Sequence, residues 1–226
     1  MLDVVALGEL LIDFTCASTD RDGYPTMVAH PGGAVANFLA AVSKFGGKTA
    51  LIGKVGNDAF GKMLLTTLER ANIGTAGMVV DDSVFTTLAF VTLDDTGDRS
   101  FSFARKPGAD TQLTWEEVDK TMIDDAKVFH FGTLSLTGEP ARTTTQKAVA
   151  YAKAQGKLIT CDPNLRKPLW ASMDEAKEQI LWGMEHCDIL KISDNEIQWL
   201  SGKEDYDEGI AWLRERYDIP LIFLTL

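Results

Sequence analysis

Asp162, Asn164 and Arg166 place an acid, an amide and a guanidinium directly after the apolar run 158–161. A short run of this kind is typical of a buried parallel strand, and in open α/β sheets the carboxyl ends of such strands open into the ligand crevice. Pro163 restricts the backbone here, so the polar side chains take defined directions. A planar guanidinium suits phosphate oxygens in particular. These residues therefore indicate a ligand site at the end of a strand.

The pair Gly32-Gly33 stands ahead of a helix-patterned segment and forms a second candidate site. Glycines let a ligand approach the backbone closely, and a helix N-terminus offers free N–H donors. Asn37 lies away from the apolar stripe of that segment, so it is not an ordinary core residue. The alternative is a tight turn followed by a solvated amide, because a short glycine motif is a weak signal alone.

Short apolar runs alternate with amphipathic segments along most of the chain. This pattern predicts an α/β fold with a mainly parallel sheet flanked by helices in three layers. The predicted strands are residues 4–7, 51–55, 128–131, 158–161, 189–192 and 221–226.

Helical spacing of apolar residues predicts a helix between residues 34 and 45. We expect one face of it to pack on the sheet, and Gly46-Gly47 to end it. That face consists of Val35, Phe38, Leu39, Val42 and Phe45.

Two β-rich runs, residues 86–93 and 100–104, interrupt the alternating pattern. The turn-forming residues 94–99 join them, which predicts a hairpin that stands off the main sheet. The polar stretch 15–30 could add strands to the same appendage.

Composition excludes several classes of function. The 226 residues are 45% hydrophobic and carry a formal charge of −11, which allows a substantial core and argues against general binding of nucleic acid or an anionic membrane. No apolar stretch approaches the ~20 residues that span a bilayer. Cys16, Cys161 and Cys187 lack the spacing of a zinc site or a disulfide framework. We therefore expect a cytoplasmic protein with reduced thiols.

Four motifs occur in order along the chain, namely Gly8-Glu9-Leu10-Leu11-Ile12-Asp13, Gly32-Gly33 with Asn37, Gly56-Asn57-Asp58-Ala59-Phe60-Gly61, and Asp162-Pro163-Asn164-Leu165-Arg166. Together they resemble the ribokinase/PfkB family of sugar kinases over essentially the whole chain. Within the family, runs 101–105, 130–133 and 163–170 are most similar to bacterial fructokinases. Val35 and Leu39 depart from that subfamily's pattern, which affects the subfamily assignment more than the family assignment.

The resemblance implies transfer of the ATP γ-phosphate to a hydroxyl of a small sugar, in a cleft between a ribokinase-like α/β body and a small β-sheet lid. We expect one domain over residues 1–226, with the lid formed by about 14–30 and 85–105. ATP and Mg²⁺ are the expected cofactors, with a monovalent cation as a further candidate. Exposed lid edges would suit a homodimer.

By motif match, Asp13, Asn37 and the backbone of Gly32 and Gly33 would hold sugar hydroxyls. A carboxylate and an amide suit this role, because polyols present donors and acceptors at fixed angles. The alternative for Asp13 is a turn residue at a strand end.

Phe103 and Arg105 end the second lid run, where fructokinase-like members place an arginine over the substrate. The alternative for Arg105 is a solvated surface residue. Asn164 and Arg166 match positions near the phosphates and sugar. Alternatively, Asn164 caps a turn and Arg166 pairs with a nearby acid.

Ser193 and Glu196 lie where the family carries an Asn-x-x-Glu motif whose glutamate helps organise magnesium and phosphate. Serine replaces the asparagine here, and Glu196 would act on Mg²⁺ through water. Ser-x-x-Glu before a helix is equally a capping box.

The resemblance places the family's catalytic base in a Gly-Ala-Gly-Asp motif beyond the equivalent of Leu226, so no residue of this chain is assigned that role. We therefore expect a C-terminally truncated kinase, active as its full-length parent and poorly active or inactive as this chain. The alternatives are a non-catalytic sugar-binding fragment, and a kinase for 2-keto-3-deoxygluconate or a nucleoside. Side chains over the sugar, Arg105 especially, would decide the substrate.

Overall fold

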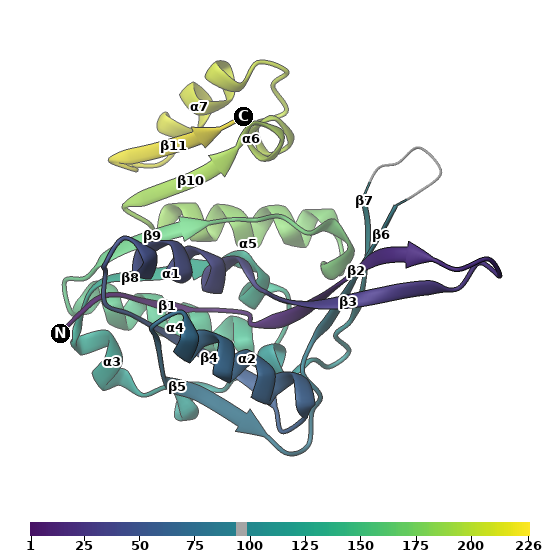
Figure 1. Cartoon of the computed structure of the whole chain (residues 1–226). Helices are drawn as coiled ribbons and strands as arrows, with labels where there is room; N and C mark the ends of the chain where they lie inside the picture. Colours follow the sequence, from purple (N-terminus) through teal and green to yellow (C-terminus); the bar gives the residue numbers. More distant parts are fainter. Residues whose placement is uncertain (94–98) are drawn as a thin grey trace.

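The computed structural model describes residues 1–93 and 99–226, which form two β-sheets and the helices around them (Figure 1). The larger sheet has seven strands in the order β11-β10-β9-β8-β1-β4-β5. Every neighbouring pair in it runs parallel, as the alternation of strands and helices predicts. Its strands are β1 (Leu2–Leu7), β4 (Thr49–Gly56), β5 (Ile73–Asp81), β8 (Ala126–Gly132), β9 (Leu158–Asp162), β10 (Ile189–Ser193) and β11 (Leu221–Thr225).

The helices cover both faces of this sheet. They are α1 (Ala34–Lys44), α2 (Ala59–Arg70), α3 (Lys120–Asp124), α4 (Ala141–Ala154), α5 (Met173–Glu185), α6 (Asp194–Ser201) and α7 (Tyr206–Arg214), with 3-10 turns at Ala109–Gln112, Trp115–Glu117, Thr133–Leu136 and Lys167–Leu169. Among the residues described, no helix is long and apolar enough to cross a membrane.

Strand β1 links the two apolar cores of the molecule. Val5 and Leu7 belong to one core, whereas Val4 and Ala6 belong to the other. Successive strand residues point to opposite faces, so the two cores lie on opposite sides of the sheet. Helices α1 and α2 supply one core, and α3 to α7 supply the other. The predicted three-layer arrangement is therefore confirmed (Figure 1).

The sequence pattern does not predict β5, which forms one edge of the large sheet. Only Ile73 and Gly77 are buried along this strand, and exposed or half-buried residues separate them. Gly74 and Gly77 weaken the local strand signal, and the apolar residues 78–80 stay half-buried or exposed at the sheet edge, so the pairing with β4 supplies what the local pattern lacks.

Helix α1 confirms the predicted helix but not all of its predicted apolar face. Val35 and Leu39 are fully buried, whereas Phe45 is 91% exposed. The helix ends at Lys44, so Phe45 leaves the helical stripe as its C-cap residue. Gly46 follows with a φ of 90°, the left-handed conformation that glycine adopts most easily.

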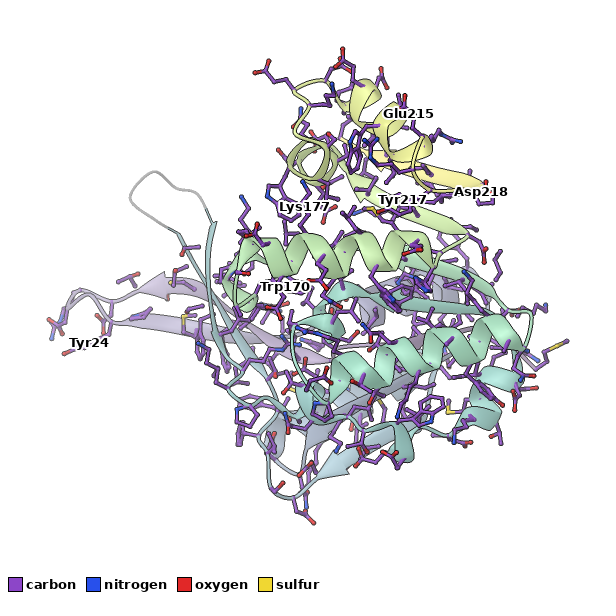
Figure 2. The ribbon with its side chains drawn as sticks, turned by 180° about the vertical axis from the view of Figure 1, so that it is seen from behind. Tyr24, Trp170, Lys177, Glu215, Tyr217 and Asp218 are labelled. Atoms are coloured by element: carbon purple, nitrogen blue, oxygen red, sulfur yellow. The ribbon has the colours of Figure 1, made fainter. Side chains whose placement is uncertain are left out.

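The second, smaller sheet projects from the large one (Figure 1). Its four strands are β2 (Leu11–Thr19), β3 (Pro25–Gly32), β6 (Leu88–Leu93) and β7 (Arg99–Ala104), in the order β3-β2-β6-β7. β6 and β7 form the predicted antiparallel hairpin, although most of its predicted turn, residues 94–98, lies outside the described residues. Figure 2 shows Tyr24 at the far tip of the β2–β3 hairpin. The use of this sheet as a lid stays a prediction.

His130 on β8 is buried between strand β9 and helix α1. Its Nδ1 lies 2.8 Å from the Thr160 hydroxyl, and its ring centroid lies 4.1 Å from that of Phe38. Burial disfavours the imidazolium and lowers the pKa of His130 from 6.5 to about 3. The folded protein therefore holds this side chain in its neutral form.

His130 should make the protein sensitive to mild acid. The unfolded chain binds a proton at this residue below pH 6.5, whereas the folded chain binds one only near pH 3. The unfolding free energy is therefore unaffected by this residue above pH 6.5 and falls as the pH drops from 6.5 towards 3. We expect the unfolding free energy of the natural chain to fall, relative to His130→Gln, by up to about 1.4 kcal/mol per pH unit. Urea unfolding at several pH values measures this, and parallel curves would contradict it.

Leu39 and Phe45 offer a matched test of the packing of α1. Leu39→Ala should lower the unfolding free energy by about 2–5 kcal/mol, because it leaves a cavity in the core. Phe45→Ala should change it by about 0.5 kcal/mol or less, because this side chain is exposed. Denaturant unfolding of both variants measures the difference, and equal costs would be incompatible with this packing.

Candidate functional site

A cavity of about 800 Å³ lies between the small sheet and the strand ends of the large sheet. Glu9, Leu134 and Asn164, which line it, follow the carboxyl ends of β1, β8 and β9 respectively. Residues of β2, β3, β6 and β7 line the opposite side. The cavity thus occupies the crevice expected in an open α/β sheet. Among the predicted site residues, Asp13, Gly33, Asn37, Phe103, Asn164 and Arg166 line it.

Asp13 on β2 lies against the backbone of Gly32 on β3. A Cβ atom on Gly32 would overlap the Asp13 carboxylate, so glycine is required for this close approach. Burial raises the pKa of Asp13, while the charges of Arg166 and His30 act in the opposite direction. The carboxylate is therefore half-buried in the cavity wall and electrostatically coupled to a guanidinium.

The N-terminus of α1 opens onto the same cavity. Its N-cap, Gly33, has a φ of 119°, and a Cβ atom there would overlap the carbonyl oxygen of Glu9. No side chain of the N-cap residue caps the helix, and the N–H of Ala34 donates a 2.6 Å hydrogen bond to Glu9. Asn37 is exposed one turn further along the helix and lines the cavity. A helix N-terminus of this kind favours electron-rich oxygen atoms of a ligand.

Glu9 lines the cavity but was not among the predicted site residues. Its side chain is buried, and burial raises its pKa to about 7. The position has a sequence signal, since Glu9 is a carboxyl group within the apolar stretch 4–12. A buried acid needs a specific environment, so this signal alone marks it for attention.

Asn164 and Arg166 extend from the end of β9 into the cavity. Asn164 has a φ of 46°, and its N–H donates to the Asp162 carboxylate at 3.1 Å, which closes a tight turn. The Arg166 guanidinium lies 5.6 Å from the ring centroid of Phe101. Among the described residues it forms no ion pair within 4.0 Å, so the alternative in which a carboxylate neutralises Arg166 is not observed.

Phe103 shares the cavity wall with Phe101. The two rings occupy alternate positions on β7 and therefore the same face, with centroids 6.3 Å apart and planes 13° apart. They form an aromatic surface opposite the polar groups at the strand ends. A ligand with both hydroxyl groups and C–H faces suits such a cavity.

Arg105 does not line the cavity. It is buried, and its Nη2 lies 2.6 Å from the Asp110 carboxylate and 2.9 Å from the carbonyl oxygen of Leu134. Its Nη1 donates to the Thr137 hydroxyl at 2.8 Å. The expected alternative of a solvated surface residue is therefore wrong, because these acceptors hold the guanidinium inside the protein. Contact of Arg105 with a substrate stays a prediction.

Ser193 and Glu196 form the capping box at the start of α6 and do not line the cavity. One Glu196 oxygen accepts hydrogen bonds from the Ser193 N–H and hydroxyl, at 2.9 Å and 2.8 Å. The other accepts the N–H of Leu165 at 2.7 Å, which ties α6 to the loop after β9. No group of three or more acidic, histidine or cysteine side chains is arranged for a metal within the part of the chain that the structure describes. The phosphate and magnesium roles stay predictions.

A three-layer α/β sheet with a second small sheet over its strand ends is an architecture in which a small ligand can bind between the two sheets. The family model for pfkB family carbohydrate kinases matches residues 1–225, and the chain belongs to this family.

Relatives of known name support the same family. The chain is 45% identical over 211 residues to the probable fructokinase-7 of Arabidopsis thaliana, covering 92% of this chain and 62% of that protein. Fructokinase of Xylella fastidiosa with bound ATP superposes with a TM-score of 0.88 at 29% identity, covering 100% of this chain and 69% of that one.

A third similar structure is the fructokinase of Vibrio cholerae in a fructose, ADP and calcium ion bound form. It superposes on this chain with a TM-score of 0.88 at 29% identity. The match covers 100% of this chain and 71% of the Vibrio cholerae chain. The chain therefore spans between 62% and 71% of the length of these three proteins.

The buried pair of Arg105 and Asp110 should be essential for stability. Arg105→Met leaves the Asp110 carboxylate buried without its partner, which should cost about 3–5 kcal/mol of unfolding free energy. Adding Asp110→Asn should recover part of this loss, because it removes the unpaired charge. Arg166→Met, at a half-buried arginine without such a pair, should cost about 1 kcal/mol or less. Denaturant unfolding compares the variants, and a neutral effect of Arg105→Met would exclude the structural role.

Proposed function

We propose that this chain forms the sugar-binding part of an ATP-dependent sugar kinase whose substrate is fructose. The observation that carries the proposal is the cavity in which Asp13, Asn37 and Arg166 converge at the N-terminus of α1. The carboxylate and amide can bind several hydroxyl groups, and the aromatic wall can pack on the C–H face of a sugar. Similarity to fructokinases, one of them in a fructose and ADP bound form, supports this choice of substrate and reaction.

The sugar would lie between Asp13, Asn37 and the backbone of Gly32 and Gly33, with Phe103 against its ring. The close contact between Asp13 and Gly32 holds the carboxylate against the cavity wall, which reduces the entropy lost on binding. In this proposal the small sheet acts as the lid of a single domain over residues 1–226, because it carries Asp13 and Phe103 itself.

Arg166 and Asn164 would face the phosphoryl group that moves from ATP to the sugar. Charge develops on the equatorial oxygens in this reaction, and a positioned guanidinium stabilises it. Burial raises the pKa of Asp13, but Asp13 lies close enough to Arg166 for the guanidinium charge to lower it, so the proposed sugar side and phosphate side of the site are neighbours. The general base is not assigned to any residue of this chain.

Mg²⁺ bound with ATP would neutralise phosphate charge near the ends of β9 and β10. Both oxygens of Glu196 already accept N–H groups, so its contribution fits a contact through water rather than direct coordination. Ser193 would act on the phosphates only through this capping box. A monovalent cation remains a further candidate without an assigned ligand.

The proposed site of action is the cytoplasm, and the proposed partner is a second copy of the chain through the exposed edges of the small sheet. Cys16, Cys161 and Cys187 are free thiols, which suits a reducing compartment. Strands β3 and β7 form the two edges of the small sheet and could pair with another copy.

Asn37→Ala should weaken fructose binding by about fivefold, because the loss of a well-placed hydrogen bond costs on the order of 1 kcal/mol. Asn195→Ala, an exposed asparagine outside the cavity, is the matched control and should leave the dissociation constant unchanged. Isothermal titration calorimetry with fructose, 2-keto-3-deoxygluconate and a nucleoside measures affinity and ranks the candidate substrates. Absence of binding for all three would refute the proposed function.

In a longer form of the protein that includes the predicted Gly-Ala-Gly-Asp segment, Arg166→Ala should reduce kcat sharply with a smaller effect on fructose KM. The same ATP-consumption assay on the present chain should give little or no fructose-dependent turnover. Rapid turnover by the present chain would require a base within residues 1–226.

A further inference from the structure

The guanidinium of Arg166 reaches the cavity with most of its hydrogen-bond donors unused. A guanidinium has five N–H donors. Within the described residues, its single hydrogen bond runs from Nη1 to the carbonyl oxygen of Leu165 at 3.3 Å, and it forms no ion pair within 4.0 Å. Arg105 differs, because Asp110 and Leu134 accept its donors. Arg166 therefore has donors available for the oxygen atoms of a ligand.

The ring of Phe101 contacts this guanidinium without using those donors. The central carbon of the guanidinium, Cζ, lies over the ring at 5.6 Å from its centroid. A cation–π contact extends to ~6 Å. Phe101 belongs to β7 and Arg166 follows β9, so the contact joins the small sheet to the strand ends of the large one. A carboxylate partner would have occupied the N–H groups, whereas the face of an aromatic ring leaves them free.

Neighbouring strands of the small sheet support Phe101. It is opposite Val91 on β6, and Val91 is opposite Thr15 on β2, so the three side chains form one row on the cavity face. Phe103 lies two positions along β7, with its ring nearly parallel to that of Phe101. All four residues line the cavity, as does Arg166. The strand register therefore fixes where the Phe101 ring stands along the cavity wall.

We propose that Phe101 is a positioning residue whose ring holds the Arg166 guanidinium toward the phosphoryl group at the site. The inference deepens the proposed function and rests on it, because that proposal gives Arg166 its phosphate role. Contact with the ring orders the arginine before a ligand binds, so less side-chain entropy is lost when phosphate oxygens take up the free donors. Since Phe101 belongs to the small sheet, the position of that sheet also sets the position of the guanidinium.

The test is a double-mutant cycle in the present chain, with fructose 6-phosphate, fructose 1-phosphate and unphosphorylated fructose as ligands. Phe101→Leu should weaken binding of the tighter sugar phosphate by about fivefold, the scale of one cation–π contact, and should weaken fructose binding less. Phe101→Tyr keeps an aromatic ring and should restore the natural affinity. In the Arg166→Met background, Phe101→Leu should change the affinity by about twofold or less, because no guanidinium is left to hold. Isothermal titration calorimetry measures all of these affinities.

Phe90→Leu is the matched control. Phe90 on β6 is half-buried like Phe101, but it is opposite Ser102 and faces away from the cavity, where its ring stacks on Phe14 at 5.3 Å. This variant removes a ring from the same hairpin and should keep the natural ratio of sugar phosphate affinity to fructose affinity.

Two affinity results would overturn the inference while leaving the proposed function intact. One is an equal loss of sugar phosphate affinity in Phe101→Leu and Phe90→Leu, which would mean that only the stability of the hairpin matters. The other is the same loss from Phe101→Leu with and without Arg166, which would mean that the ring contacts the ligand itself.

The guanidinium N–H signals of Arg166 give a readout that needs no ligand. They should lie upfield in the natural chain relative to Phe101→Leu, because protons over an aromatic ring are shielded, and Phe90→Leu should leave them in place. Identical signals in the natural chain and Phe101→Leu would overturn the inference. Sugar phosphate affinity that Arg166→Met leaves unchanged would refute the phosphate role of Arg166, and absence of fructose binding by the natural chain would refute the proposed function. The inference fails with either.

Discussion

A buried ion pair at the root of the small sheet determines where the two sheets meet. Arg105 leaves the end of β7 and pairs with Asp110, which also accepts the Thr87 hydroxyl just before β6. The same guanidinium donates to Leu134 and Thr137, in the turn that follows β8. Both strands of the hairpin are therefore fastened to the carboxyl edge of the large sheet. Within a low-dielectric interior an unpaired charge in such a network is costly, so these contacts favour the observed junction.

A second tie fastens the small sheet from the side of α2. One Asp58 oxygen caps the helix through the N–H groups of Phe60 and Gly61, each at 2.9 Å. Its other oxygen accepts the Thr86 N–H at 2.8 Å, and the Thr86 hydroxyl accepts the Gly56 N–H at 3.0 Å. The motif around Asp58 thus holds the residues just before β6 in place, and it does not line the cavity. Motifs shared with a family need not all be binding residues, because holding the cavity together requires specific chemistry too.

The local sequence was sufficient for most of the fold and for part of the site. Continuous apolar runs predict the central strands because both faces of a parallel sheet are buried. They do not predict β5, whose edge position leaves Ile73 and Gly77 as its only buried residues. At the site, the glycines and Asn37 were identified from the helix pattern that follows them. Glu9 was not, because a single acid in an apolar stretch gives no indication of which group it faces.

By itself, the sequence determined the three layers, the alternation of strands and helices that gives a parallel sheet, and the polar groups at the ends of strands. These features follow from hydrophobic periodicity and backbone preferences. Only the tertiary structure decided which of those groups share a cavity. Arg105 and Arg166 have the same chemistry, yet Asp110 holds one inside the protein while the other stays at the cavity without an ion pair among the described residues. Whether each arginine is buried in an ion pair depends on partners that are remote in sequence or brought close by a turn. No local sequence pattern encodes which partners come close.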